Sequence, residues 1–454
     1  MCCLLRTRRI SMHSKRLAMA LALVPALMST GCDWLFGKEL KPEFCATHPT
    51  DSDCVAYCAD HPSDPNCDLD APKGCASSAE CSAPTAVCDV AGTKTCVECV
   101  APDETAACTG AEPVCGDDHT CRRCVAHAEC ASAACLSDGT CALETSVAYV
   151  DPNGTDNSMC TLAMPCTEVA KALATSRPFV KFKGTTDEAV TLNGEDVTFL
   201  AEPGARLTRT SPGIVLRVDG GTKLSVHGLE IADGLGATGT GIALIAGNTA
   251  TVSLTGVKLV NNAGGGITTS GGTLTVSRSK ISGNAGGGIS ISASSFDITN
   301  SFITQNGGPA SLVGGINFAT VAGAGTRRLD FNTISANAGT ATVNSGVNCG
   351  TVGSPITFSN NIIFANVVSG GGKQLGGSAN CTATFSDIGP DPTSGTGNIN
   401  ADPLFVNVVQ GNFHIQPASP AKNAADPAAT LSVDFDGDVR PQGGRSDIGA
   451  DEAP

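Results

Sequence analysis

The chain has 454 residues and a formal net charge of −15, with 43 acidic and 28 basic side chains. That length favours more than one domain. The acidic excess argues against nucleic acid as a partner, because nucleic-acid binding depends on basic side chains that neutralise phosphates. The same charge would repel an acidic polysaccharide unless a cation lies between the two.

Residues 1–32 have the pattern of an export signal. Five basic residues and no acidic residue occur there, and they precede an apolar stretch, Leu17–Met28. This stretch is too short to span a bilayer and has the length of a signal-peptide core. Met1 and Met12 are both candidate start sites, since the residues after Met12 also form a basic leader.

The end of this leader resembles a bacterial lipobox, in which a cysteine is lipidated and becomes the new N-terminus. The resemblance rests on Gly31 and Cys32, and it departs from the family at Ser29, where an aliphatic residue is usual. It implies that Cys32 anchors an exported protein at the cell envelope, at the outer membrane or the cell surface. An ordinary signal peptide followed by a chance cysteine is the alternative, and Asp33 leaves the choice of membrane open.

Cysteines dominate the next two segments, an acidic linker of residues 33–74 and a region of residues 75–146. Even cysteine counts in an exported chain with few large apolar residues indicate small disulfide-rich modules, whose connectivity the sequence does not determine. Zinc binding by the CxxC pairs between modules is the alternative. The region resembles the cysteine-rich stalks of bacterial surface lipoproteins. The linker carries a 13-residue duplication with two cysteines per copy, and the three four-cysteine modules span residues 75–96, 99–121 and 124–141.

A sequence motif with a period of 22 residues occurs three times between Gly256 and Asn306. Apolar and polar residues alternate in each copy, and Gly and Asn separate the short runs, which indicates strands and tight turns. A fixed period of this size marks a solenoid whose repeats bury their apolar faces against one another. Leucine-rich repeats have a similar period, but their leucine spacing and helix are missing. The equivalent apolar anchors are Leu259, Ile281 and Ile303, and the equivalent amides are Asn262, Asn284 and Asn306.

This repeat resembles the right-handed parallel β-helix proteins of the pectate-lyase-like superfamily. The resemblance implies an all-β fold, a right-handed parallel β-helix solenoid over residues 147–454. Thr167–Ala174 has the pattern of a short N-terminal helix that caps the open end of the stack. Coils longer than 22 residues are expected to carry inserted loops, where solenoids often bind their partners.

Two cysteine pairs lie within this domain. We expect Cys160 and Cys166 to close a small loop near its start. Cys349 and Cys381 are about one coil apart in sequence, and adjacent strands of a sheet lie about 4.8 Å apart, within the reach of a disulfide. We therefore expect them to join consecutive coils, with two buried free thiols as the alternative.

Most of the last 55 residues resemble the closing segment of bacterial β-helix surface proteins of the choice-of-anchor type. The resemblance implies secretion and a surface location, but no reaction. The stretches that carry it are residues 400–405, 412–420, 434–441 and 446–452.

Relatives in this superfamily include polysaccharide lyases, which need a basic side chain and a cation or acid that neutralises a uronate. Glu230, Lys258 and Lys280 are the catalytic candidates, because they occupy equivalent outward positions in successive coils, with Phe302 next. A ladder of surface ion pairs explains the same column. Aromatic platforms for sugar stacking are scarce, since the domain has one Tyr and no Trp.

Asp434, Asp436 and Asp438 are the candidate metal ligands. Their Asp-x-Asp-Gly-Asp spacing places three carboxylates on one tight loop, as calcium requires. The glutamate of a complete EF-hand loop is missing, so an Asp-rich turn without a metal is the alternative.

Two functions remain. The first is a non-catalytic, surface-anchored β-helix lipoprotein that serves adhesion or contacts the cell envelope, with a polysaccharide or surface protein as partner and the membrane reached through its lipid anchor. The second is a lyase that acts on acidic polysaccharide with a cation. A groove along the coils lined by carboxylates with Lys or Arg would favour the lyase, whereas Thr, Ser, Asn and Gly alone would favour the binding protein.

Overall fold

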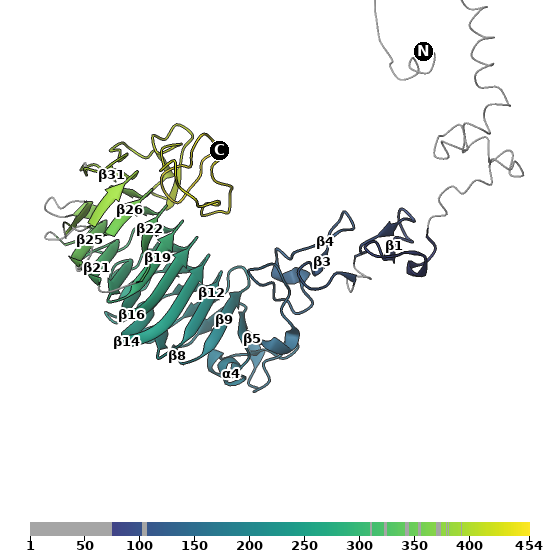
Figure 1. Ribbon diagram of the computed structural model, residues 1–454. Coiled ribbons are helices and arrows are strands. Elements are labelled where there is room, and N and C mark those ends of the chain that lie inside the picture. Colours follow the sequence, from purple (N-terminus) through teal and green to yellow (C-terminus); the bar gives the residue numbers. More distant parts are fainter. Residues whose placement is uncertain are drawn as a thin grey trace, which may run out of the picture. The chain divides into compact units, whose positions relative to one another are not determined.

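The computed structural model describes residues 75–101, 107–308, 311–321, 325–340, 345–352, 356–368, 374–377, 379, 381–391 and 393–454 (Figure 1). The predicted export signal, the lipidation residue Cys32 and the duplicated cysteine pairs lie outside these ranges. A first compact unit ends at Arg123, and a second runs from Cys124 to Pro454. The third four-cysteine module therefore belongs to the same unit as the domain predicted from residue 147 onward.

Disulfides hold the three four-cysteine modules. In each module the first cysteine pairs with the third and the second with the fourth. The twelve cysteines of the modules are thus bonded to one another, so the prediction of small disulfide-rich modules is confirmed. Their short elements are η2 (Ser78–Glu80), β1 (Val87–Cys88) paired with β2 (Cys96–Val97), β3 (Val114–Cys115) paired with β4 (Cys121–Arg122), and η4 (His127–Glu129).

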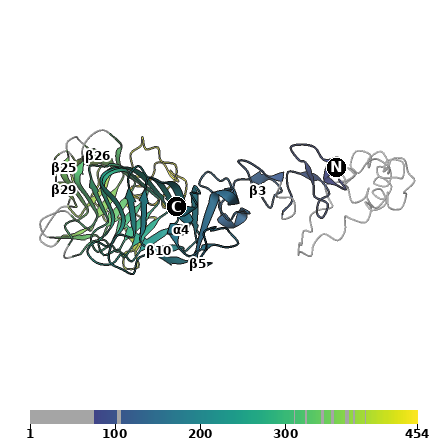
Figure 2. The same cartoon turned by 90° about the horizontal axis from the view of Figure 1, so that it is seen from below.

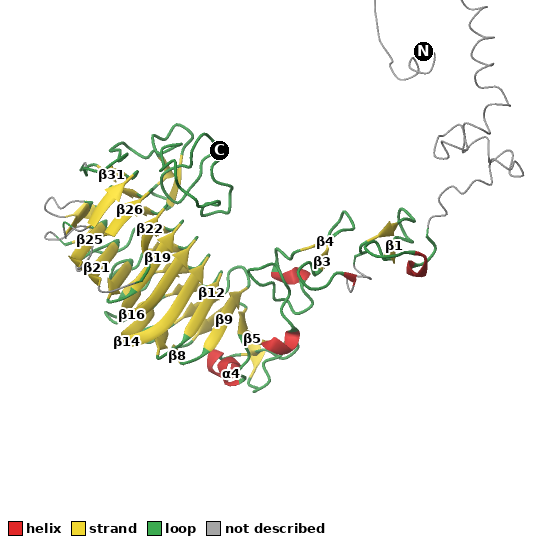
Figure 3. Ribbon diagram, in the orientation of Figure 1, coloured by secondary structure: helices red, strands yellow, loops and turns green. Residues whose placement is uncertain are grey.

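The rest of the second unit is a parallel β-solenoid, which confirms the predicted fold. Each complete coil contributes strands to three faces, called A, B and C, and equivalent strands of successive coils pair in parallel. Strands account for most of its regular structure (Figure 3), and Figure 2 shows the stack turned by 90°. Within the described residues, no helix is long and apolar enough to cross a membrane.

Face A is a nine-stranded sheet. It comprises β7 (Thr185–Asp187), β10 (Arg206–Thr208), β13 (Glu230–Ala232), β15 (Lys258–Val260), β17 (Lys280–Ser282), β20 (Phe302–Thr304), β23 (Thr333–Ser335), β27 (Ile362–Phe364) and β31 (Asp387–Gly389).

Faces B and C join in one 16-stranded sheet, because β14 (Thr240–Thr255) and β16 (Gly265–Ser277) each run through the corner between them. Besides the later parts of these two strands, face B comprises β5 (Val147–Thr155), β6 (Phe179–Phe182), β9 (Asp196–Ala201), β12 (Lys223–His227), β19 (Ser295–Thr299), β22 (Arg327–Asp330), β26 (Ile356–Ser359) and β30 (Cys381–Thr384). Besides their earlier parts, face C comprises β8 (Val190–Asn193), β11 (Leu216–Asp219), β18 (Ile289–Ser292), β21 (Ile316–Val321), β25 (Val347–Val352) and β29 (Leu375–Gly377).

The repeat predicts the register of the coils. Ile281 pairs with Leu259 on one side and with Ile303 on the other, and all three side chains are fully buried in one core. The amides stack as well: Asn284 Nδ2 donates to Asn306 Oδ1 (2.8 Å), and Asn262 Nδ2 donates to Asn284 Oδ1 (2.9 Å). The buried stack then continues through Asn337, Asn366 and Gln374.

A short helix and a disulfide loop lie where the solenoid begins. The helix α4 (Val169–Ala174) buries Val169 and Ala172 in the solenoid core, as expected of a cap. The carboxylate of Glu188 accepts hydrogen bonds from the N–H groups of Val169 and Ala170 and so satisfies the start of this helix. The 3₁₀ helix η5 (Glu144–Ser146) leads into β5.

Both cysteine pairs of the solenoid form the disulfides that their spacing predicts. Cys160 and Cys166 are bonded with a Cα–Cα distance of 4.8 Å. Cys349 and Cys381, 6.3 Å apart between Cα atoms, join β25 of one coil to β30 of the next.

The C-terminal segment, residues 393–454, folds back over face A instead of only closing the end of the stack (yellow in Figure 1). Its contacts with face A include a hydrogen bond from the Ala450 N–H to Thr333 Oγ1 (3.1 Å), and Phe435 packs against Phe302 with ring centroids 4.7 Å apart. Its own strands β32 (Phe405–Asn407) and β33 (Asn412–Ile415) form a hairpin, and β24 (Ala338–Gly339) pairs with β28 (Val367–Val368) in the coil insertions.

Substitutions in one coil test this register. Ile281→Ala should lower the free energy of unfolding by about 2–5 kcal/mol, the usual cost of a cavity in a packed core. Lys258→Ala, at an exposed position of the neighbouring coil, should change it by less than about 0.5 kcal/mol. Equilibrium urea unfolding of the whole chain measures both, and equal effects would show that the inward column is misassigned.

Candidate functional site

The structure brings the three catalytic candidates into the predicted column. Glu230, Lys258 and Lys280 are in register on face A, and Phe302 follows. Glu230 does not pair with Lys258, however. Its Oε1 lies 2.7 Å from Arg206 Nε in the preceding coil, so its carboxylate is already engaged.

Lys280 is not the freely exposed surface residue that its position suggests. Its ammonium donates to the Gly411 carbonyl (3.2 Å), because the C-terminal segment covers this part of face A. Burial, followed by the charge of Lys258, lowers the pKa of Lys280. The column is therefore divided between an ion pair at Glu230, an exposed Lys258 and a covered Lys280.

The carboxylate of Asp434 organises the loop on which it lies. Asp434 is fully buried, and its Oδ1 accepts the N–H groups of Gly437 (2.9 Å) and Asp438 (2.8 Å). Its Oδ2 accepts the N–H of Glu452 (3.0 Å). These bonds give Asp434 the role of a turn residue, and the exposed Asp438 carboxylate is not grouped with it.

A different set of potential ligands gathers nearby. Among the described residues, His414, Asp436 and Asp451 offer one ligand atom each, all within 4.8 Å of one another. His414 had no predicted role, and Asp451 lies in the last stretch of the C-terminal segment. Of the three predicted ligands, only Asp436 belongs to this set.

The same segment contains a buried ion pair between Arg440 and Glu452. Arg440 Nη1 lies 2.9 Å from Glu452 Oε2, and both side chains are almost fully inaccessible. Arg440 also donates to the carbonyls of Asp447 and Gly449, and its guanidinium lies 4.6 Å from the ring centre of Phe331. These contacts fix the final residues on the solenoid, so we assign this pair a structural role.

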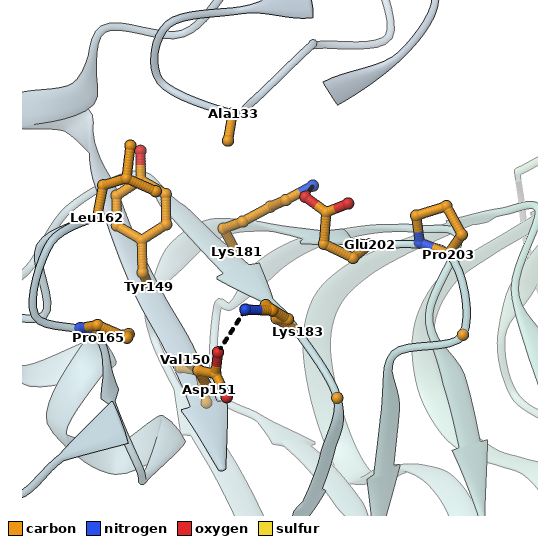
Figure 4. A pocket seen from close by; sticks show the side chains of 12 residues that line it. Ala133, Tyr149, Val150, Asp151, Leu162, Pro165, Lys181, Lys183, Glu202 and Pro203 are labelled. Atoms are coloured by element: carbon orange, nitrogen blue, oxygen red, sulfur yellow. Dashed lines mark ion pairs between the residues drawn. The ribbon is translucent and has the colours of Figure 1, made fainter. Parts of the chain in front are cut away.

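A cavity of about 500 Å³ lies near the start of the solenoid (Figure 4). Tyr149 and Asp151 come from β5, Lys181 from β6, and Glu202 from the turn after β9. The Tyr149 hydroxyl donates to the Ser132 carbonyl (2.5 Å), which ties the third cysteine module to the first coil. Apolar groups complete the lining: Ala133, Val150, Leu162, Pro165 and Pro203.

Two lysine–carboxylate pairs line this cavity. Lys183 Nζ lies 3.0 Å from Asp151 Oδ2, and Lys181 Nζ lies 3.0 Å from Glu202 Oε1. The Lys181 side chain is only 3% exposed, and its ammonium makes no well-aligned hydrogen bond. Burial lowers the pKa of Lys181 to about 8, although Glu202 opposes that shift. Nothing in the repeat predicts this group, because Lys181 precedes the 22-residue coils and is covered by the third cysteine module.

A second concavity, of about 470 Å³, follows face C of the central coils and is called the face C groove below. Thr268, Ser290 and Asn317 are in register along it and point out of the core. No side chains fill the bottom of this groove, because the main chains of successive coils approach each other closely at glycines. A Cβ added to Gly286 would lie 2.4 Å from the Gly264 carbonyl oxygen. The remaining lining residues are Ala237, Ala263, Gly265, Ile267, Ala285, Gly287, Ile289, Ser311, Leu312 and Val313.

The face C groove is thus uncharged among its described lining residues. Hydroxyl and amide side chains donate and accept hydrogen bonds, but they neither abstract a proton from carbon nor neutralise a carboxylate. The arrangement is suited to binding a polar, neutral chain molecule.

No family model matches the chain, and no curated protein matches it either. Solved structures do match. One of them, described as the crystal structure of pectate lyase Pel9A, is similar with 15% sequence identity and a TM-score of 0.44, over 68% of this chain and 96% of that chain. The likeness concerns the parallel β-solenoid fold.

The Lys181–Glu202 pair can be tested by removing each partner in turn. Glu202→Gln should destabilise the protein by about 1–3 kcal/mol at pH 7, because it leaves a buried ammonium without a counter-charge. This range is below that of a fully buried pair, since Glu202 is 32% exposed. Lys181→Met should cost less than about 1 kcal/mol, because it removes the buried charge itself.

The effect of pH on these variants follows from the direction of the Lys181 shift. The folded pKa is about 8 and the reference value is 10.5, so the unfolded chain binds more protons between these values. The stability cost of Lys181 is therefore full below pH 8 and falls as pH rises toward 10.5. Thermal unfolding at pH 7 and pH 9.5 should show a smaller deficit for Glu202→Gln at pH 9.5, whereas a deficit independent of pH would contradict the assignment.

Proposed function

We propose that the protein is an exported, envelope-anchored β-solenoid that binds a neutral polysaccharide without catalysis. The observation that supports this proposal is the face C groove, whose described lining consists of uncharged small, polar and aliphatic residues. Hydroxyl and amide groups at Thr268, Ser290 and Asn317 repeat from coil to coil along one line, and they match the repeated hydroxyls of a glycan chain.

Electrostatics favours a neutral ligand over an acidic one. The whole chain carries a net charge of −15, and residues 148–454 carry 17 basic and 23 acidic residues, a net charge of 17 − 23 = −6. An acidic polysaccharide would meet repulsion from this surface and would find no basic side chain among the described residues of the groove. A neutral chain avoids both costs.

Export is supported by the disulfides. Eight disulfides occur among the described residues, and disulfides persist in oxidising compartments. Anchoring rests on the sequence around Gly31 and Cys32, which lies outside the described residues.

Filling the face C groove tests the binding proposal. Ser290→Tyr should weaken binding to a panel of neutral polysaccharides at least tenfold, because the new ring would occupy the space of the ligand. Ser253→Tyr is the matched control, since Ser253 faces outward on face B and does not line the groove. Binding of the whole mature protein can be measured by affinity electrophoresis or a glycan array, and equal loss in both variants or none in either would refute the proposal.

A lyase is the second candidate, and Lys181 is the observation that favours it. An amine whose pKa is about 8 is partly unprotonated near neutral pH, and it lines a cavity of about 500 Å³. Release of unsaturated uronate, followed at 235 nm across acidic polysaccharides with and without calcium, decides between the two. Activity that is lost in Lys181→Met would establish the lyase and overturn the non-catalytic proposal.

Replacement of Cys32 tests the anchor. Cys32→Ser should move the protein from the membrane fraction to the soluble fraction, because a serine cannot carry the thioether-linked lipid. Fractionation with immunodetection gives the distribution, and mass spectrometry of the mature N-terminus gives the acyl chains. Membrane retention of the variant, together with an unacylated wild-type N-terminus, would rule out the lipoprotein.

A further inference from the structure

We propose that the C-terminal segment binds one divalent cation of the borderline class, represented by zinc, through His414, Asp436 and Asp451. The three residues come from three separate stretches: the hairpin strand β33, the turn after Asp434, and the last residues of the chain. Their ligand atoms lie within 4.8 Å of one another. A cation with bonds of about 2.0–2.2 Å draws such atoms closer together, and His414 and Asp436 have the exposure needed to move.

The orientation of the His414 imidazole is the main observation that supports a cation site. His414 Nδ1 lies 2.6 Å from Asn412 Oδ1, and His414 Nε2 lies 2.8 Å from Asp436 Oδ2. Both ring nitrogens thus face oxygen atoms. When Nδ1 carries the proton and donates to Asn412, the Nε2 lone pair points at a carboxylate, which is repulsive unless a second proton or a cation lies between them. A histidine that ligates a metal through one nitrogen commonly donates from the other to an oxygen, as His414 does to Asn412.

The local charge is consistent with a bound cation. Asp451 is 7% exposed, and its carboxylate lies within 4.8 Å of the Asp436 carboxylate. Arg278 contacts this loop, but it donates to the main-chain carbonyls of Phe435 (3.1 Å) and Asp436 (3.2 Å). Asp451 Oδ2 accepts the Ile415 N–H (2.7 Å), and a divalent cation would balance the charge that the two carboxylates share.

The donor set favours zinc over the calcium that the aspartate spacing alone predicts. Calcium takes six to eight oxygen ligands, whereas one imidazole nitrogen with two carboxylates suits zinc and similar ions. Asp434 is unavailable, because its two oxygens accept three main-chain N–H groups. A cation at the proposed site would join the hairpin, the turn and the chain end, and so would hold the C-terminal segment over face A.

Metal binding by the mature whole chain, with its disulfides intact, tests this proposal. After treatment with EDTA, the protein is dialysed against zinc or calcium, and the bound metal is quantified by mass spectrometry. Wild-type protein should bind one zinc equivalent that Asp436→Asn and His414→Gln lose or bind at least tenfold more weakly. Asp438→Asn is the matched control, because Asp438 is an exposed acid of the same turn outside the ligand set, and it should retain this equivalent.

The comparison among variants separates this site from zinc held elsewhere in the chain. The thermal unfolding temperature should rise with zinc in the wild type and in Asp438→Asn, but not in the other two variants. Asp436→Asn keeps the test valid if His414→Gln does not fold, since Asp436 is half exposed. Three results would each overturn the proposal: equal zinc binding by the wild type and Asp436→Asn, wild-type protein that binds no zinc, or calcium binding in preference to zinc.

Discussion

The buried asparagine ladder is the interaction on which the solenoid depends. Asn284 accepts from both the main-chain N–H and the side-chain amide of Asn262, and it donates to the Leu259 carbonyl and to Asn306. All of these groups are inaccessible to water, so a missing amide would leave several polar atoms unpaired at a cost of about 1–3 kcal/mol each. The ladder continues unbroken through coils of different length. Insertions are therefore confined to loops, while the amides keep one position per coil.

This ladder also determines which surfaces remain available. Because the ladder fixes the turns between strands, the side chains of successive coils form straight columns. The three faces therefore differ in the side chains that they expose. Face A is covered in part by the C-terminal segment, which contacts Lys280, Phe302 and Thr333. Face C keeps a groove, because the glycines at its corner leave no side chains to fill it. We therefore place the proposed polysaccharide in the face C groove and not on the charged column of face A.

Much of the solenoid was predictable from the sequence because its contacts repeat. The column of Leu259, Ile281 and Ile303, the stacked amides and the Cys349–Cys381 disulfide all follow from counting residues at one coil length. Contacts between segments far apart in sequence carry no such period. Lys280 is covered by the segment around Gly411, which follows it by 131 residues in the sequence. The short distance between His414 and Asp451 likewise depends on how the C-terminal segment folds. Sequence reasoning therefore placed Lys280 in the right column but gave it the wrong surroundings.

The charged groups of the solenoid domain differ in how completely they are compensated, and this difference separates structural roles from functional ones. Arg440 and Glu452 are buried together, and main-chain groups satisfy much of their remaining hydrogen-bonding capacity. Lys181 has a carboxylate partner in Glu202, but burial lowers the pKa of its ammonium to about 8. His414 directs both ring nitrogens at oxygens beside a buried aspartate. The Arg440–Glu452 pair is held by main-chain partners on both sides, with Arg440 Nε as its one atom that lacks a partner, whereas Lys181 and His414 lie where a ligand could still reach them, away from the neutral groove. The polysaccharide binding and the ion binding that we propose therefore lie on different surfaces of the solenoid domain.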